Sequence, residues 1–407
     1  MLWDCQPKFA TFAILVLVTC LRATAQTQPT KVAQFTLQDY GWPPTELSRK
    51  WPGSLSKVLA IDRQGRVLVG FTVRENDSPP TQEHPGFSFH ILRFNRDGRV
   101  DLSLALPTNN LYNNGFYLGA DSQIFVRTNE IIQWTPSGRG DGQDLQTGRT
   151  WQPLVACPRN CEIIQSPTRR TMVVHANSKM MSDANYSHGG VTNTLVDTSL
   201  SPPLIATGCS HFESVAAESL PLWIFTDTFA YGTRGTDRQR FVNRWPICQP
   251  EHDSELPVSL QGGALRMLSD ELFLVVGMNK MGRIGTAAIF RDMELIAPDG
   301  QVKFLREMPK HDLINPNTPS TSSERGDRFA LVVETWRGGS DFFDISSKMV
   351  ACRVAIYTET GQELASIPVH PVYSDLRGWR GFDLAMSPDG HRIAVLDQGV
   401  VTVADLE

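Results

Sequence analysis

Short apolar runs joined by tight-turn residues recur along most of the chain, and this repetition constrains the fold more than any other sequence feature. The clearest example is the last. Ser-Pro-Asp-Gly at 387–390 joins two apolar runs, and a third run at 400–403 follows Gln398-Gly399. Proline presets φ, aspartate bonds to its own backbone, and glycine accepts a positive φ, so the stretch predicts a three-stranded antiparallel meander. Such a meander cannot bury its apolar face alone and must stack on neighbours.

The same strand–turn–strand plan occurs in seven units of roughly fifty residues, a period typical of repeat architectures. The units lie at 58–106, 116–139, 162–207, 220–248, 265–307, 323–369 and 384–403. Each predicts a four-stranded antiparallel sheet except the last, which has three strands, and the unit at 220–248 has the weakest pattern. We therefore predict an all-β fold, a seven-bladed β-propeller formed by residues 26–407 as a single domain.

The β-like run at 32–37 precedes the first unit and offers the strand that the last unit lacks. We expect it to pair with the run at 400–403 and close the ring, which also covers an exposed sheet edge. The alternative is a β-sandwich followed by a second β domain.

Two stretches carry a family resemblance. SPDGHRIAVLDQG at 387–399 is similar to the Ser-Pro-Asp-Gly repeats of TolB-like and WD-type propellers, and RQGRVLVGF at 63–71 resembles an NHL-type blade. The blades lack the Gly-His and Trp-Asp pairs of WD-type repeats, which argues against the eukaryotic scaffold subfamily. The resemblance implies architecture only, because such blades occur in enzymes, receptors and scaffolds.

Composition and charge exclude some partners. The chain has 407 residues, 41% of them hydrophobic and 20% charged, with a formal net charge of −5. No dense run of Lys or Arg and no basic stripe with interleaved aromatics occurs, so we expect no nucleic-acid surface.

The first residues have the pattern of a signal peptide. Lys8 precedes an apolar run at 9–21, and Ala-Thr-Ala follows at 23–25, the small-x-small pattern of a cleavage site. The run is shorter than the about 20 residues of a membrane span. We predict a signal peptide at 1–25 and a mature, monomeric chain that is exported to the periplasm or the extracellular space, without a membrane span. An uncleaved anchor is the alternative.

The mature chain would keep five cysteines, an odd number. Cys157 and Cys161 could form a local disulfide, and Cys209 could pair with Cys248 around the fourth unit. The Cys-x3-Cys spacing lacks a second nearby pair, so it argues against a metal site.

Motifs for known chemistry are missing. The sequence has no nucleophile elbow, zinc-protease helix, phosphate-binding loop or EF-hand. The run 144–151 resembles one copy of the docking motif of quinoprotein propellers, which repeat it around the ring. We therefore expect no cofactor, and expect Trp151 to pack between blades.

Propeller architecture does predict one polar constellation. The connections after the second strand of each blade open at one end of the ring, where ligands usually bind. The polar residues just past the apolar part of each second strand are Arg74, Arg127, His175, Asp227, Asn279, Glu334 and Asp397. They are candidates for a ligand site at this mouth; the alternative is that each is a separately solvated strand end.

Two functions remain. The first is an exported, non-catalytic recognition or scaffold protein that binds a protein or glycan at one face of the ring. The second is a metal-assisted hydrolase or lactonase at the channel mouth, with Glu334 and Asp397 as ligands and His175 as base. The absence of a recognisable nucleophile or ligand set favours the first.

Overall fold

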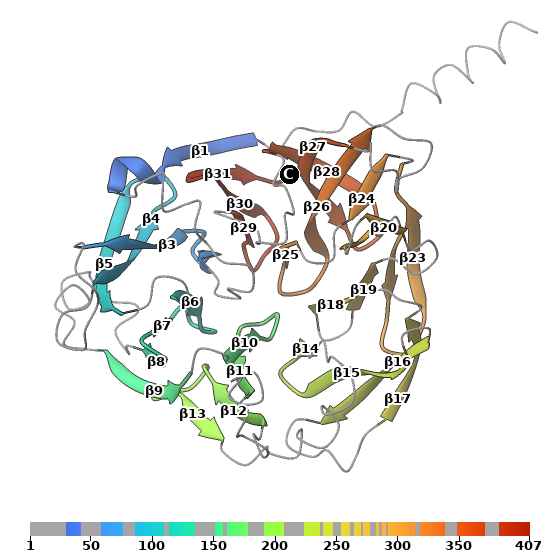
Figure 1. Cartoon of the computed structure of the whole chain (residues 1–407), viewed down its shortest axis with the longest axis horizontal. Coiled ribbons are helices and arrows are strands. Elements are labelled where there is room, and N and C mark those ends of the chain that lie inside the picture. The colour runs from blue at the N-terminus through green and yellow to red at the C-terminus, as the bar shows by residue number, and fades with distance from the viewer. Residues whose placement is uncertain are drawn as a thin grey trace, which may run out of the picture.

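The strands follow one another around a central axis and form a closed ring (Figure 1). The computed structural model describes residues 30–41, 58–75, 86–109, 114–134, 151–157, 161–177, 191–206, 224–236, 239–246, 254–260, 264–269, 272–276, 282–284, 287–289, 292–309, 311–314, 318–337, 348–370 and 382–407. Within these residues the strands form seven antiparallel sheets arranged as blades, and a separate hairpin. The seven-bladed propeller predicted from the repeats is confirmed.

The first three blades each have four strands in sequence order. Blade 1 comprises β2 (Leu59–Ile61), β3 (Val67–Arg74), β4 (Phe87–Phe94) and β5 (Val100–Thr108). Blade 2 comprises β6 (Gly115–Leu118), β7 (Ile124–Thr128), β8 (Ile131–Trp134) and β9 (Gln152–Ala156). Blade 3 comprises β10 (Cys161–Gln165), β11 (Thr171–Asn177), β12 (Val191–Asp197) and β13 (Leu204–Ala206).

The next three blades vary this plan. Blade 4 comprises β14 (Ile224–Phe225), β15 (Phe229–Thr236), β16 (Gln239–Pro246) and β17 (Ser254–Leu260). Blade 5 comprises β18 (Ala264–Ser269), β19 (Leu272–Val276), β22 (Asp292–Ile296) and β23 (Val302–Glu307), with the hairpin β20 (Gly282–Ile284) and β21 (Ala287–Ile289) between β19 and β22. Blade 6 has a divided inner strand, β24 (Asp312–Ile314) and β25 (Ser320–Ser322), followed by β26 (Arg328–Arg337), β27 (Lys348–Thr358) and β28 (Glu363–Val369).

Blade 7 combines the two ends of the described chain. It comprises β29 (Phe382–Met386), β30 (Arg392–Asp397), β31 (Val400–Asp405) and, as its outermost strand, β1 (Thr30–Thr36). A 3-10 turn, η1 (Leu37–Tyr40), follows β1. Among the described residues, no helix is long and apolar enough to cross a membrane. The expected signal peptide at 1–25 lies outside them.

Two predicted units had incomplete or shifted strands. In blade 4 the described inner strand is β14 and the second strand is β15, so Asp227, which we predicted to follow the second strand, precedes it instead. In blade 2 the fourth strand, β9, lies beyond the predicted unit. Trp151, next to β9, packs on the apolar cluster between blades 1 and 2, as expected.

One turn chemistry recurs between the first and second strands. In blade 7 the Ser387 hydroxyl accepts a hydrogen bond from the Arg392 amide (2.9 Å), and Gly390 takes φ +74°. In blade 1 the Asp62 carboxylate accepts from the amides of Gln64 and Arg66 (both 2.9 Å). A side-chain oxygen at the first position thus satisfies amides that the turn leaves without a strand partner.

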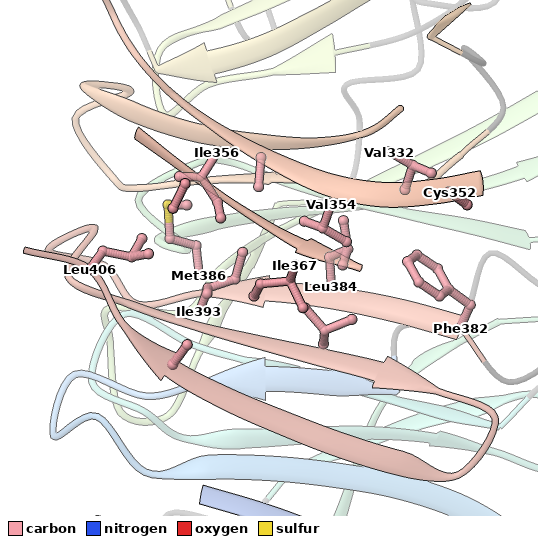
Figure 2. Close-up of a cluster of buried hydrophobic side chains, with 14 of the residues drawn as sticks. Val332, Cys352, Val354, Ile356, Ile367, Phe382, Leu384, Met386, Ile393 and Leu406 are labelled. Atoms are coloured by element: carbon pink, nitrogen blue, oxygen red, sulfur yellow. The ribbon is translucent and has the colours of Figure 1, made fainter. Parts of the chain in front are cut away.

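Apolar side chains fill the space between neighbouring blades. The close-up in Figure 2 shows Val332, Val354 and Ile356 of blade 6 facing Phe382 and Leu384 of blade 7. Inner strands are buried on both faces, as in β29, whereas the outer strand β5 alternates between buried and exposed positions. The two-sided burial explains why the inner strands read as continuous apolar runs.

The predicted closure of the ring by the N-terminal run is confirmed. β1 pairs antiparallel with β31, with Phe35 opposite Val401 and Thr36 opposite Val400. The Phe35 ring also stacks on Phe94 of blade 1, with centroids 3.7 Å apart, and Leu37 is fully buried between these blades. β1 therefore completes blade 7 and contacts blade 1 at once.

A buried carboxylate strengthens the same seam. One oxygen of Asp383, in the inner strand of blade 7, accepts hydrogen bonds from the amides of Val58 and Leu59 at the start of blade 1 (both 3.0 Å). Bonds to a charged acceptor are stronger than neutral ones, and these span more than 320 residues of sequence.

We predict that deleting residues 30–38 lowers the free energy of unfolding by several kcal/mol. The deletion removes the β1–β31 ladder and the burial of Phe35 and Leu37, and burying one large apolar side chain contributes about 1.5–3 kcal/mol. The uncovered edge of β31 should also promote aggregation. Urea titration and gel filtration measure both effects. Deleting residues 26–29, which precede β1, is the control and should change neither; equal stability of the two truncations would contradict the role of β1.

Candidate functional site

The two ends of the ring differ in the length of their connections. The first and second strands of every blade are joined by five residues or fewer. We call the end that carries these connections the turn face. The opposite end carries the connections from second to third strands and from the fourth strand of one blade to the first strand of the next. Six of these exceed nine residues: 75–86, 178–190, 207–223, 277–291, 338–347 and 370–381. We call this end the long-loop face. On the turn face, which also carries the connections from third to fourth strands, one connection exceeds nine residues, 135–151 in blade 2.

The predicted mouth residues fall mostly at the long-loop face. Arg74, Arg127, Glu334 and Asp397 lie at or near the long-loop end of the second strands of their blades, and so does the backbone of His175. Asp227 does not, because it lies in the turn between β14 and β15, on the turn face. This correction follows from the shifted strands of blade 4. Asn279 lies outside the described residues.

Two of these side chains are structural groups of the ring interior. Arg127 is 4% exposed and donates a hydrogen bond to the Cys161 carbonyl of blade 3 (3.2 Å). Burial lowers the pKa of its guanidinium. Glu334 is 1% exposed and accepts a hydrogen bond from the Trp336 indole (3.1 Å). Neither is a solvated strand end, so the alternative that treated all seven residues as such is wrong for these two.

Asp397 makes a different contact. Its Oδ2 atom accepts from the backbone amide of His370 and lies 2.9 Å from Nδ1 of the same residue, while its Oδ1 atom is buried without a hydrogen-bond partner. The His370 side chain is 66% exposed. The carboxylate thus fixes an imidazole at the long-loop face, between the last strand of blade 6 and the second strand of blade 7.

The described cysteines give one disulfide. Cys157 and Cys161 are bonded, with Cα atoms 5.3 Å apart, and connect blade 2 to blade 3, as the local pairing predicted. Cys209 and Cys248 lie outside the described residues. Cys352 is buried between blades 6 and 7.

A metal centre finds no support in the part of the chain that the structure describes. No three described His, Cys, Asp or Glu side chains lie close enough together to hold an ion. Glu334 and Asp397 instead bond to Trp336 and His370.

The turn face is tied together by arginines that sequence reasoning did not single out. Arg63, in the first turn of blade 1, donates to the Ala120 carbonyl of blade 2 (2.7 Å) and forms an ion pair with Glu324 of blade 6 (2.5 Å). The Glu324 amide in turn donates to the Pro388 carbonyl of blade 7 (2.9 Å). One turn therefore contacts the turns of blades on both sides.

Arg169 reaches across the middle of the ring. It lies in the first turn of blade 3, and its guanidinium donates to the Ile61 carbonyl of blade 1 (2.7 Å) and the Met386 carbonyl of blade 7 (3.4 Å). Blades 3 and 7 are three positions apart in a ring of seven (Figure 1). Arg63, Arg169 and Glu324, which we call the arginine network, thus link five blades directly.

The surroundings of Arg169 disfavour the positive charge of its guanidinium. Burial lowers the pKa of Arg169 to about 10; nearby Arg63 also lowers it, whereas Glu324 and Asp62 raise it. The side chain remains charged at neutral pH. Because bonds from a charged donor to carbonyls are strong, the network stabilises the turns that it joins.

The backbone of Arg169 is also unusual. It adopts φ +65°, at the turn position where blades 1, 6 and 7 have Gly65, Gly326 and Gly390. A non-glycine residue in this region costs about 1–2 kcal/mol. Aligning the turns by sequence could have revealed this residue, because a long side chain replaces a glycine whose conformation the turn requires.

Comparisons with known proteins identify no family. No protein-family model matches the chain, and no curated protein matches its sequence. A chain of the S. cerevisiae complex of Dbp5 with Nup159 and Gle1 is similar at 11% identity and a TM-score of 0.48, covering 94% of this chain and 96% of that one.

Two further solved structures are similar at the same level. The N-terminal domain of Nup159 has 12% identity and a TM-score of 0.46, covering 94% and 97% of the two chains. The C-terminal WD40 domain of Sif2 has 10% identity and a TM-score of 0.41, covering 94% and 100%. We draw no functional argument from likenesses this remote.

We predict opposite effects of glycine and alanine at two adjacent residues. Arg169→Gly should be more stable than Arg169→Ala by about 1 kcal/mol, because both lose the same hydrogen bonds but only glycine relieves the positive φ. At Arg170, whose φ is not positive, glycine should be the less stable substitution. Urea denaturation of the four variants tests this. Alanine being the better replacement at both positions would show that the Arg169 backbone is not strained.

Proposed function

We propose that the chain is an exported, monomeric β-propeller that recognises a protein or glycan partner at its long-loop face. The observation that carries the proposal is the difference between the two ends of the ring. The arginine network and mostly short connections fix the turn face, where one connection exceeds nine residues, whereas six such connections emerge at the other end. Binding residues are disproportionately found on loops held by a rigid scaffold.

Described side chains support the choice of face. Arg74 and Arg337 are exposed at the ends of β3 and β26, where the connections 75–86 and 338–347 begin. His370, held by Asp397, is exposed where the connection to blade 7 begins. These groups offer hydrogen-bond donors next to the long connections, on strands that packing keeps in place.

Export rests on two separate features. Residues 1–25 have the pattern of a cleaved signal peptide. The bond between Cys157 and Cys161 fits an oxidising compartment, because disulfides are rare in reducing ones. The hydrolase alternative receives no comparable support, since the described residues place no ligand cluster at the proposed mouth.

We expect substitutions at the long-loop face to weaken partner binding. Arg74→Glu and Arg337→Glu should each reduce affinity about tenfold, the effect of a strong interface residue, with an unchanged thermal midpoint. Arg99→Glu, in the turn between β4 and β5 on the turn face, is the matched control; Arg99 is exposed, and the change should alter affinity less than twofold, or about 0.4 kcal/mol. An array of glycans and a panel of purified extracellular proteins supply the candidate partners. Equal losses at both faces would contradict the proposal.

A further inference from the structure

A polar groove lies between blades 5 and 6 on the turn face, away from the proposed recognition face. Its volume is about 450 Å³, within the range of small-ligand and peptide sites. Leu272, Ala297 and Pro298 form its apolar part, and of these Leu272 and Ala297 are buried. The groove is therefore a second surface with an apolar base.

Each wall of the groove carries one cation and one carboxylate. Blade 5 contributes Asp299 and Lys303, and blade 6 contributes Arg325 and Glu359; all four side chains are exposed. Lys303 bonds to Gln301 (3.2 Å), and Asp299 accepts from the Gln301 amide (2.9 Å). Among the described residues, the side chains of Arg325 and Glu359 make no hydrogen bond or ion pair, so both can bind a ligand without breaking an existing contact.

The walls are held in place before any ligand binds. The Glu359 amide donates to the Asp327 carbonyl (2.9 Å), which ties together the two turns of blade 6 that line the groove. Gly326, at φ +72°, packs so closely on blade 5 that a Cβ atom would lie 3.2 Å from the Leu268 carbonyl carbon. Preorganisation of this kind lowers the entropic cost of binding.

The charges and residue types of the lining favour one class of ligand over others. Among the described residues of the lining, two cations are balanced by two carboxylates, so these residues lack the excess of positive charge that nucleic acids and anionic lipids require. None of these described lining residues is an aromatic that could provide a flat stacking surface for a sugar or a base. What remains complementary is a ligand with an apolar centre and both signs of charge.

We propose that this groove binds a short extended peptide segment in which an apolar residue lies between an acidic and a basic residue. The apolar side chain packs on Leu272 and Ala297. The acidic side chain pairs with Arg325 and Lys303, and the basic one with Glu359 and Asp299. The site is independent of the long-loop face, so either proposal can fail without the other.

The test uses fluorescein-labelled pentapeptides with the central sequences Glu-Leu-Lys, Glu-Leu-Glu, Lys-Leu-Lys and Gln-Leu-Gln, measured by fluorescence anisotropy with the full mature chain. The mixed-charge peptide should bind about fivefold more tightly than each of the other three, because each lacks at least one favourable ion pair. Equal affinity for all four, or no binding of the mixed-charge peptide at millimolar concentration, would overturn the proposal.

The substitution Arg325→Glu should change which peptide binds most tightly, rather than only weaken peptide binding. It leaves three carboxylates and one ammonium group in the groove, so the preference should move from the mixed-charge peptide to the doubly basic one. Lys348→Glu, the same charge reversal at the other end of blade 6, is the control and should keep the original preference. Since both side chains are exposed, neither change should prevent folding. An unchanged preference in Arg325→Glu would place the peptide elsewhere.

Discussion

Closure of the ring by β1 is the constraint on which the rest of the structure depends. The apolar faces of each blade pack on its two neighbours, so an open ring would leave two apolar faces without a partner. The seam between blades 7 and 1 is closed by three separate means: the β1–β31 ladder, the stacking of Phe35 on Phe94, and the amides bound by Asp383. The arginine network can reach from blade 3 to blades 1 and 7 only because this seam holds their carbonyls in place.

Most of the fold could be predicted from the sequence because propeller blades are built from local signals. Turn residues such as Ser387 and Gly390, and the apolar runs beside them, specify a hairpin without distant information. Blade 4 shows the limit of that reasoning. Its second strand, β15, contains Gly232 and Gly235, which weaken a strand pattern, and the sequence therefore predicted Asp227 to follow the second strand rather than to precede it. The spacing of the repeats indicated a blade but could not fix the register.

Less of the candidate site than of the fold could be predicted from the sequence. Strand ends could be assigned to one face from the topology, and this placed Arg74, Arg127, Glu334 and Asp397 correctly. The burial of Arg127 and Glu334 could not be predicted, because it depends on neighbours such as Trp336 and the Cys161 carbonyl that the ring brings close. The reach of Arg169 was still less predictable, since its acceptors lie 108 and 217 residues away in sequence. An alignment of the turns can single out Arg169, but it cannot say which distant carbonyls its guanidinium reaches.

The pairing of β1 with β31 also has a consequence for the order of folding. During synthesis β1 is made before any blade, yet its partner strand is the last one of the ring, with Thr36 opposite Val400. Contacts between segments so far apart form slowly, because a large loss of chain entropy precedes them. Until then the apolar side chains of β1 have no native partner on blade 7, and the nascent chain must carry an unpaired, aggregation-prone strand while all the blades are completed.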